Sequence, residues 1–83
     1  MFETGLVVDG VHGIYVGREV VAMARDLGWD GPEWDADDPM RYFTEEDARD
    51  WLNEHHAAEG HWFDWHEGSF FYLSDAEWEE VYA

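Results

Sequence analysis

The sequence predicts an α+β fold in which a small antiparallel sheet of three to four strands carries two main helices and a short C-terminal helix. Short runs of β-branched and aromatic residues beside glycine-bearing turns predict the strands, and apolar residues that recur with a helical period predict the helices. The 83 residues contain no linker and no internal repeat that would divide them. The expected order is β-β-α-loop-α-β-β-α, in a single acidic domain over residues 1–83.

The first two strands are expected to form a hairpin. Leu6–Val8 and Ile14–Val16 are rich in β-branched residues, and the Asp9–Gly13 segment between them contains two glycines. Glycine readily adopts the positive φ angles that tight hairpin turns require. The sequence therefore predicts two paired strands near the N-terminus.

A short helix and an irregular segment follow. Val20, Ala24 and Leu27 recur at the helical spacing i, i+4 and i+7. Gly28 stands where a helix commonly ends. Residues 29–43 contain two prolines and several aromatic residues, so we expect a loop that its rings hold against the core.

The second main helix is expected to begin at Thr44 and to run to about Ala58. The Thr44 hydroxyl can cap a free N–H group, and the carboxylates of Glu45–Asp47 lie where the positive end of a helix favours negative charge. The 3.6-residue period predicts a buried stripe of Ala48, Trp51, Leu52 and His55. The opposite side carries Glu46, Asp50, Asn53 and Glu54.

A second hairpin and a terminal helix complete the expected fold. Residues 61–66 and 69–73 flank Glu67–Gly68, a two-residue connection typical of a hairpin. Ser74–Glu77 has the spacing of a capping box and predicts the start of a helix. That helix includes Trp78, Val81 and Tyr82.

The charge of the chain excludes several functions. Twenty-one acidic residues face four arginines, for a net charge of −17. A protein that binds nucleic acid or an anionic membrane gains affinity from lysine and arginine, so neither partner is expected. Residues 1–28 carry a net charge of −2 and residues 29–83 a net charge of −15, so the acidity belongs to the later part of the chain.

Other features narrow the class of protein further. Aromatic residues make up 18% of the chain, which favours a folded domain over an acidic disordered tail. There is no cysteine, and neither a signal segment nor a membrane span is predicted, so we expect a cytoplasmic protein. The few serines and threonines are explained as caps and turn residues, so no catalytic residue, no cofactor and no enzymatic activity is predicted.

A cluster of imidazole groups suggests a metal-binding domain as one alternative. Five potential ligands lie within twelve residues: His55, His56, His61, Asp64 and His66. On a strand Asp64 and His66 share one face and His61 the other, so at most two ligands converge locally. Polar positions beside aromatic residues are the favoured interpretation, and no metal ligand is assigned.

Two resemblances bear on function. Gly13–Val16 ahead of a helix, an acidic tryptophan-bearing helix and the Trp62–Leu73 hairpin resemble in outline small phage- and plasmid-encoded proteins of undescribed activity. In size and acidity the chain also resembles phage-encoded DNA-mimic inhibitors of host defence, the anti-CRISPR and anti-restriction proteins. The second resemblance implies a stoichiometric inhibitor. It is one of composition, so it assigns no residue.

The acidic loop and the second helix form the predicted partner-binding surface. Closely spaced carboxylates on rigid elements can imitate the phosphate charge of DNA. The expected partner is therefore the basic DNA-binding surface of a host nucleoprotein complex, with a CRISPR effector subunit favoured. An exposed Trp34 or Tyr42 is expected to assist as an anchor. The full set is Asp30, Glu33, Trp34, Asp35, Asp37, Asp38, Tyr42, Glu45, Glu46, Asp50 and Glu54.

Three alternatives remain open from the sequence. The chain could be a decoy for a restriction or DNA-repair enzyme, or an interaction module adapted to high salt without DNA mimicry. It could also be the small metal-binding domain described above.

Overall fold

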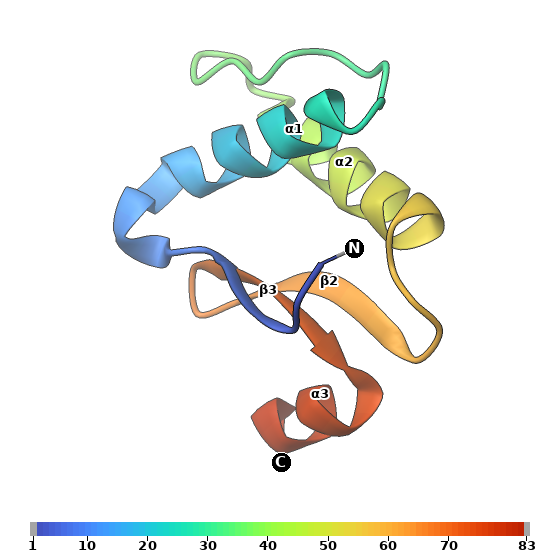
Figure 1. Ribbon diagram of the computed structural model, residues 1–83. Helices are drawn as coiled ribbons and strands as arrows, with labels where there is room; N and C mark the ends of the chain where they lie inside the picture. Colours follow the sequence, from blue (N-terminus) through green and yellow to red (C-terminus); the bar gives the residue numbers. More distant parts are fainter. Residues whose placement is uncertain (1, 83) are drawn as a thin grey trace.

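The fold has three layers, with α1 and α2 on one face of the sheet and α3 on the other (Figure 1). A computed structural model describes residues 2–82. Its elements are β1 (Gly5–Val8), the 3₁₀ helix η1 (Gly10–Tyr15), α1 (Val16–Asp26), α2 (Arg41–His55), β2 (His61–His66), β3 (Ser69–Ser74) and α3 (Asp75–Tyr82). The predicted α+β class and antiparallel sheet are confirmed.

The sheet is built around β3, in the order β1-β3-β2. β2 and β3 pair antiparallel, with Trp62 opposite Leu73 and His66 opposite Ser69. Glu67 and Gly68 between them have φ angles of 50° and 83°. Positive φ at both central residues is what a type I′ hairpin turn requires. The predicted second hairpin is therefore confirmed.

The predicted first hairpin is wrong, because only one of its strands forms. β1 pairs with β3, and the segment after it winds into η1. The Asp9 carboxylate accepts a hydrogen bond from the Val11 N–H at 3.0 Å, which turns the chain. Ser69 Oγ accepts one from the Gly10 N–H at 2.8 Å and ties η1 to the sheet. Val16 opens α1 with 3% of its surface exposed, so burial outweighs the strand preference of its side chain.

The predicted short helix is confirmed as α1, with one change in its buried face. Val20, Val21 and Ala24 are buried, whereas Leu27 is 40% exposed because it lies beyond the last turn. Gly28 follows with a φ of 117°, in the region that favours glycine. α1 therefore ends just before Gly28, as the sequence predicts.

The start of α2 differs from the prediction. The helix begins at Arg41, and Thr44 lies buried inside it rather than at its cap. The Asp38 carboxylate accepts the Met40 N–H at 2.9 Å, and the Asp38 carbonyl accepts the Arg41 N–H at 3.1 Å. Asp38 therefore holds the turn that leads into the helix, and Pro39 lies in that turn, before the first helical residue.

One side of α2 packs on the core, although its extent differs from the prediction. The buried residues are Thr44, Ala48 and Leu52. They belong to a core that also includes Val20, Val21, Phe63, Phe70 and Tyr72. Trp51 is half-buried, but His55 is exposed and ends the helix. Ala58 lies outside the helix, where its N–H donates to the Tyr72 hydroxyl at 2.9 Å.

Asn53 closes the outer edge of β2. Its amide accepts from the Phe63 N–H at 2.6 Å and donates to the Phe63 carbonyl at 3.0 Å. Next along the edge, the Trp65 N–H donates to the Asp64 carboxylate at 2.8 Å. The prediction that Asn53 belongs to the exposed side of the helix is therefore wrong. An open strand edge invites pairing with another chain, and these bonds prevent it.

The predicted capping box opens α3. The Ser74 N–H donates to Glu77 Oε1 at 3.0 Å, and the Glu77 N–H donates to Ser74 Oγ at 3.2 Å. These bonds, first the one from the Ser74 backbone, lower the pKa of Glu77 below its ordinary value of 4.5. Within residues 2–82, no helix has the length and apolar character needed to cross a membrane.

Candidate protein-binding surface

The predicted partner-binding residues lie on two neighbouring segments, the loop between α1 and α2 and α2 itself (Figure 1). Eight of them are exposed: Asp30, Glu33, Asp35, Asp37, Tyr42, Glu46, Asp50 and Glu54. Three are half-buried: Trp34, Asp38 and Glu45. All belong to the helical layer, on the face of the sheet opposite α3.

The exposed side of α2 carries the most regular part of this surface. Glu46, Asp50 and Glu54 recur at i, i+4 and i+8, so they form one row along the helix. Asp47 is also exposed beside this row. The sequence pattern places Asp47 only in the first turn of the helix. Because the helix begins at Arg41, Asp47 belongs instead to the exposed carboxylate surface.

Trp34 fastens the loop to α2, and of the two residues predicted as an exposed anchor it is the half-buried one. Its indole Nε1 donates to Glu45 Oε2 at 2.9 Å, and its ring packs on Tyr15 with centroids 5.5 Å apart. A side chain on Gly17 of α1 would collide with the Glu45 carboxylate, so glycine there allows the approach. Tyr42, in contrast, is 59% exposed, as an anchor should be.

Two loop carboxylates hold the backbone as well as facing solvent. Asp35 Oδ1 accepts the Asp37 N–H at 2.9 Å, and Asp38 makes the matching bond to Met40. Short bonds of this kind from an aspartate to the backbone two residues later stabilise turns. The loop carboxylates are therefore presented from a fixed backbone.

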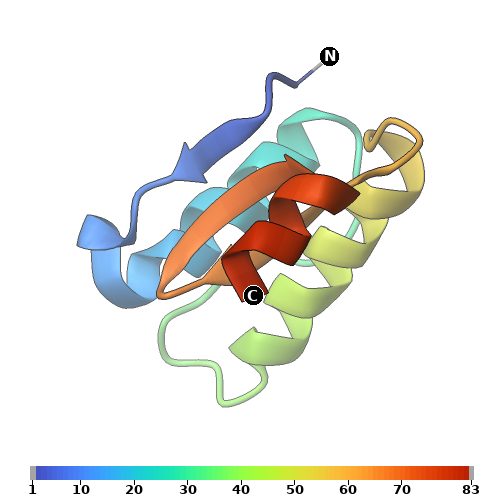
Figure 2. The ribbon, with the colours of Figure 1, turned by 90° about the horizontal axis from the view of Figure 1, so that it is seen from below.

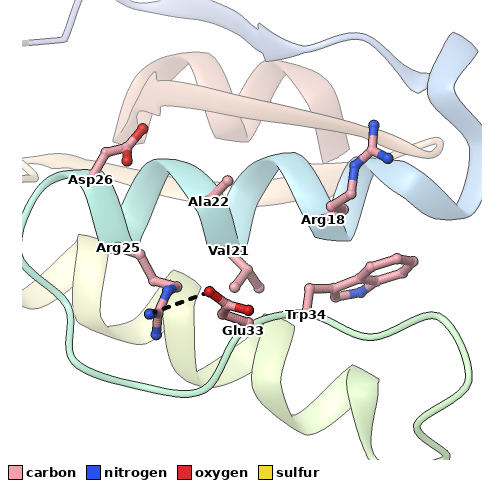
Figure 3. Close-up of a pocket in the computed structure, with 7 residues that line it drawn as sticks. All are labelled: Arg18, Val21, Ala22, Arg25, Asp26, Glu33 and Trp34. Carbon is pink, nitrogen blue, oxygen red and sulfur yellow. Dashed lines mark ion pairs between the residues drawn. The ribbon is translucent and has the colours of Figure 1, made fainter.

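A hollow of about 310 Å³ lies between α1 and the loop, and Figure 3 shows the residues around it. Arg18 and Arg25 come from α1, and Glu33 and Trp34 come from the loop. Arg25 Nη2 lies 3.9 Å from Glu33 Oε1, and Arg25 also donates to the Gly31 carbonyl. Two of the four arginines thus border the acidic surface on this side.

Arg49 joins α2 to the edge of the sheet. Its guanidinium lies 3.1 Å from the Asp64 carboxylate, 3.2 Å from the Asp50 carboxylate and 5.6 Å from the centroid of the Trp65 ring. Burial alone lowers the pKa of Arg49, but the hydrogen bonds and charges of the two aspartates outweigh burial and raise it above its ordinary value. Asp50 keeps 66% of its side chain exposed despite this pairing.

Exposed apolar side chains lie at the start of α2. Met40, Tyr42 and Phe43 are 55%, 59% and 59% exposed. The sequence predicts that the aromatic residues of 29–43 hold the loop to the core; Trp29 and Trp34 do so, whereas Tyr42 and Phe43 do not. The reason is the earlier helix start, which places Tyr42 and Phe43 away from the buried stripe of α2. An apolar cluster thus adjoins the acidic row.

Carboxylates are not confined to the helical layer. α3 carries Asp75, Glu79 and Glu80 in exposed positions on the other face of the sheet. Figure 2, seen from the side of α3, shows this helix covering that face. The acidic charge of residues 29–83 is therefore spread over two faces of the domain.

The histidines and serines contact several different neighbours and are not gathered at one site. His61 stacks on the Tyr72 ring at 5.6 Å, and His66 lies 3.9 Å from Glu67. His55 is exposed beside Trp51, at a centroid distance of 4.9 Å. Among residues 2–82, the structure brings together no three histidine or carboxylate groups that could hold a metal ion. Ser69 and Ser74 accept backbone hydrogen bonds.

Comparison with protein-family models, with curated proteins and with solved structures gave no match. The function must therefore be argued from the surface itself.

Proposed function

We propose that this protein is a stoichiometric inhibitor that mimics the charge of DNA and occupies the nucleic-acid-binding surface of a host defence complex, with a CRISPR effector favoured. The observation that carries the proposal is the exposed row of Glu46, Asp50 and Glu54 along α2. The loop before α2 adds further carboxylates, and two of them hold its backbone by hydrogen bonds. A basic groove that normally accepts DNA would meet a similar field.

The charge density of α2 supports the proposal. From Glu45 to Glu54 the helix carries five carboxylates and one arginine, a net charge of −4. At about 1.5 Å of rise per residue, this stretch is roughly 14 Å long. One strand of B-DNA has about one phosphate per 3.4 Å, or roughly four charges over the same length. The helix as a whole, with the half-buried Glu45 included, therefore carries about as much charge per unit length as one DNA strand.

The apolar cluster at the start of α2 supplies a second kind of contact. Electrostatic potentials of opposite sign raise the rate at which two proteins associate. Buried apolar and aromatic side chains supply much of the binding free energy. Tyr42 and Phe43 stand beside the carboxylate row and could enter a pocket on the partner. An effector complex must read duplex DNA beside its target before cleavage, so a bound decoy acts at recognition.

Charge reversal tests the proposal. The variant Glu46→Lys, Asp50→Lys and Glu54→Lys removes the row at exposed positions. We expect at least about a tenfold loss of inhibitory potency in a DNA-cleavage assay of the target complex. Potency close to that of the wild type would overturn the assignment.

A matched control separates the row from the net charge. Glu3→Lys, Glu59→Lys and Glu80→Lys change the net charge by the same amount at exposed positions outside the row. This control is expected to retain most of its potency. Equal losses in both variants would show that total charge, rather than the α2 surface, determines inhibition.

The exposed carboxylates of α3 favour a second candidate, a salt-adapted interaction module without DNA mimicry. A salt-adapted surface is acidic on all sides, and α3 makes the second face acidic as well. Urea unfolding at low and at molar salt discriminates between the two. For a mimic, salt raises the free energy of unfolding only by screening the repulsion between carboxylates, and this effect is complete within a few tenths molar salt. For a salt-adapted fold, the free energy of unfolding continues to rise far above that concentration.

A further inference from the structure

A second hollow, of about 360 Å³, is lined by residues of α3 and β2. α3 lies on the face of the sheet opposite α1 and α2 (Figure 2). Its lining residues are Trp62, Asp75, Trp78, Glu79 and Tyr82. The hollow thus combines three aromatic rings with two carboxylates. None of these residues belongs to the acidic row of α2.

The three rings lie against one another, and two of them remain exposed. The Trp78 ring lies 6.5 Å from the Trp62 ring and is stacked on Tyr82 at 5.8 Å. Trp78 Nε1 already donates to the Trp62 carbonyl at 3.2 Å, so the indole N–H is satisfied. Trp62 is 46% exposed and Tyr82 63% exposed, whereas Trp78 is buried beneath them. Large aromatic surface therefore remains open to solvent beside the hollow.

The structure of residues 2–82 pairs no cation with the two carboxylates of the hollow. Asp75 and Glu79 stand four residues apart on α3, so they lie on the same side of the helix. Within the part of the chain that the structure describes, neither carboxylate takes part in an ion pair. All four arginines belong to α1 or α2. The chain thus has no arginine in the layer where this hollow lies.

The same protein shows how an arginine occupies such surroundings elsewhere. Arg49 stacks over the Trp65 ring and pairs with the carboxylates of Asp64 and Asp50. Arg18 and Arg41 likewise lie over the rings of their neighbouring tyrosines, at 4.9 Å and 4.6 Å. The hollow beside α3 has the same combination of ring and carboxylate, but among residues 2–82 no cation pairs with its carboxylates.

The geometry points to a binding site for an arginine side chain of a protein partner in the hollow formed by Trp62, Asp75, Trp78, Glu79 and Tyr82. A cation over an aromatic face is attracted by the ring, and the planar guanidinium stacks while it donates to carboxylates. The strongly negative field of the chain adds to the attraction. This site is separate from the α2 row and does not depend on the proposed decoy function.

The test uses the whole chain and N-acetylarginine methylamide as the probe. The indole N–H resonances of Trp62 and Trp78 are followed by ¹H–¹⁵N NMR during titration at constant ionic strength. We expect saturable shifts with roughly millimolar half-saturation, as suits one cation–π contact with an exposed ion pair. The citrulline derivative, a neutral isostere, is expected to cause no saturable shift.

Two substitutions on α3 provide a matched pair. Glu79→Gln removes a carboxylate from the hollow, whereas Glu80→Gln makes the same change at an exposed position outside it. We expect Glu79→Gln to weaken binding about threefold and Glu80→Gln to leave it unchanged. Equal effects of the two variants, binding of citrulline as strong as that of arginine, or no saturable shift would each overturn the site. Tighter binding of the lysine derivative would overturn its assignment to arginine.

Discussion

Removal of the Asn53 amide is expected to destabilise the fold and to open the edge of β2. Asn53→Ala deletes both hydrogen bonds to Phe63, at 2.6 Å and 3.0 Å, and leaves that N–H and carbonyl without their partner. Two net hydrogen bonds contribute about 2 kcal/mol. Water can reach the partly buried edge, so no larger penalty is expected.

The size of this effect can be measured by thermal unfolding. For a chain of 83 residues the entropy of unfolding is about 0.17 kcal/mol per kelvin, so about 2 kcal/mol lowers the Tm by roughly 12 °C. Circular dichroism follows the Tm, and urea unfolding gives the free energy directly. Glu54→Ala, at the exposed neighbouring position, is the control and should change stability by less than about 0.5 kcal/mol.

A small effect would refute the reasoning about the edge. If Asn53→Ala lowered the Tm no more than Glu54→Ala, the two bonds would add nothing to the attachment of α2 to β2. Size-exclusion chromatography adds an independent readout. An unpaired strand edge promotes pairing between chains, so Asn53→Ala is expected to self-associate more than the wild type at high concentration.

Three further predictions concern the cap, the loop and the edge ion pair. Because the folded-state pKa of Glu77 is lowered below its ordinary 4.5, its stabilising contribution is present above that pH and is lost as the pH falls below it. Glu77→Gln should therefore lower the Tm at pH 7 and make little difference at about pH 3; a Tm difference of equal size at both would contradict this. Trp34→Phe removes the bond to Glu45 and should destabilise the fold by about 1 kcal/mol, with faster amide hydrogen exchange in the loop; unchanged exchange would argue against the attachment. Arg49→Gln breaks the ion pair with Asp64 and should cost about 1 kcal/mol in urea unfolding at low salt and less at high salt; a loss independent of salt would indicate packing rather than charge.

Local signals predicted the C-terminal part of the fold well. The α3 cap needs only hydrogen bonds between Ser74 and Glu77, and the hairpin turn needs only positive φ angles at Glu67 and Gly68. Both features involve residues close in sequence, so they form as the sequence indicates. The N-terminal hairpin failed for the opposite reason. Val16 had the composition of a strand, but its burial in α1 depends on distant residues of the core.

The candidate site was predictable in composition but not in detail. The row of Glu46, Asp50 and Glu54 follows from helical periodicity and is exposed as expected. The half-buried place of Trp34 depends on a bond to α2 that no local pattern reveals. Phe43 is exposed because the helix begins at Arg41, a few residues before the predicted start at Thr44. A shift of this size in a helix boundary changes which side chains face the core.

The most direct test of the central claim is competition between this protein and DNA for one surface. The tagged chain is used to capture a partner from a host lysate, and the bound complex is then challenged with duplex DNA and, separately, with raised salt. The account predicts that a nucleic-acid-binding complex is retained and that both duplex and salt release it, because carboxylates and phosphates compete for the same basic groups. A captured partner that remains bound in the presence of excess duplex would contradict DNA mimicry.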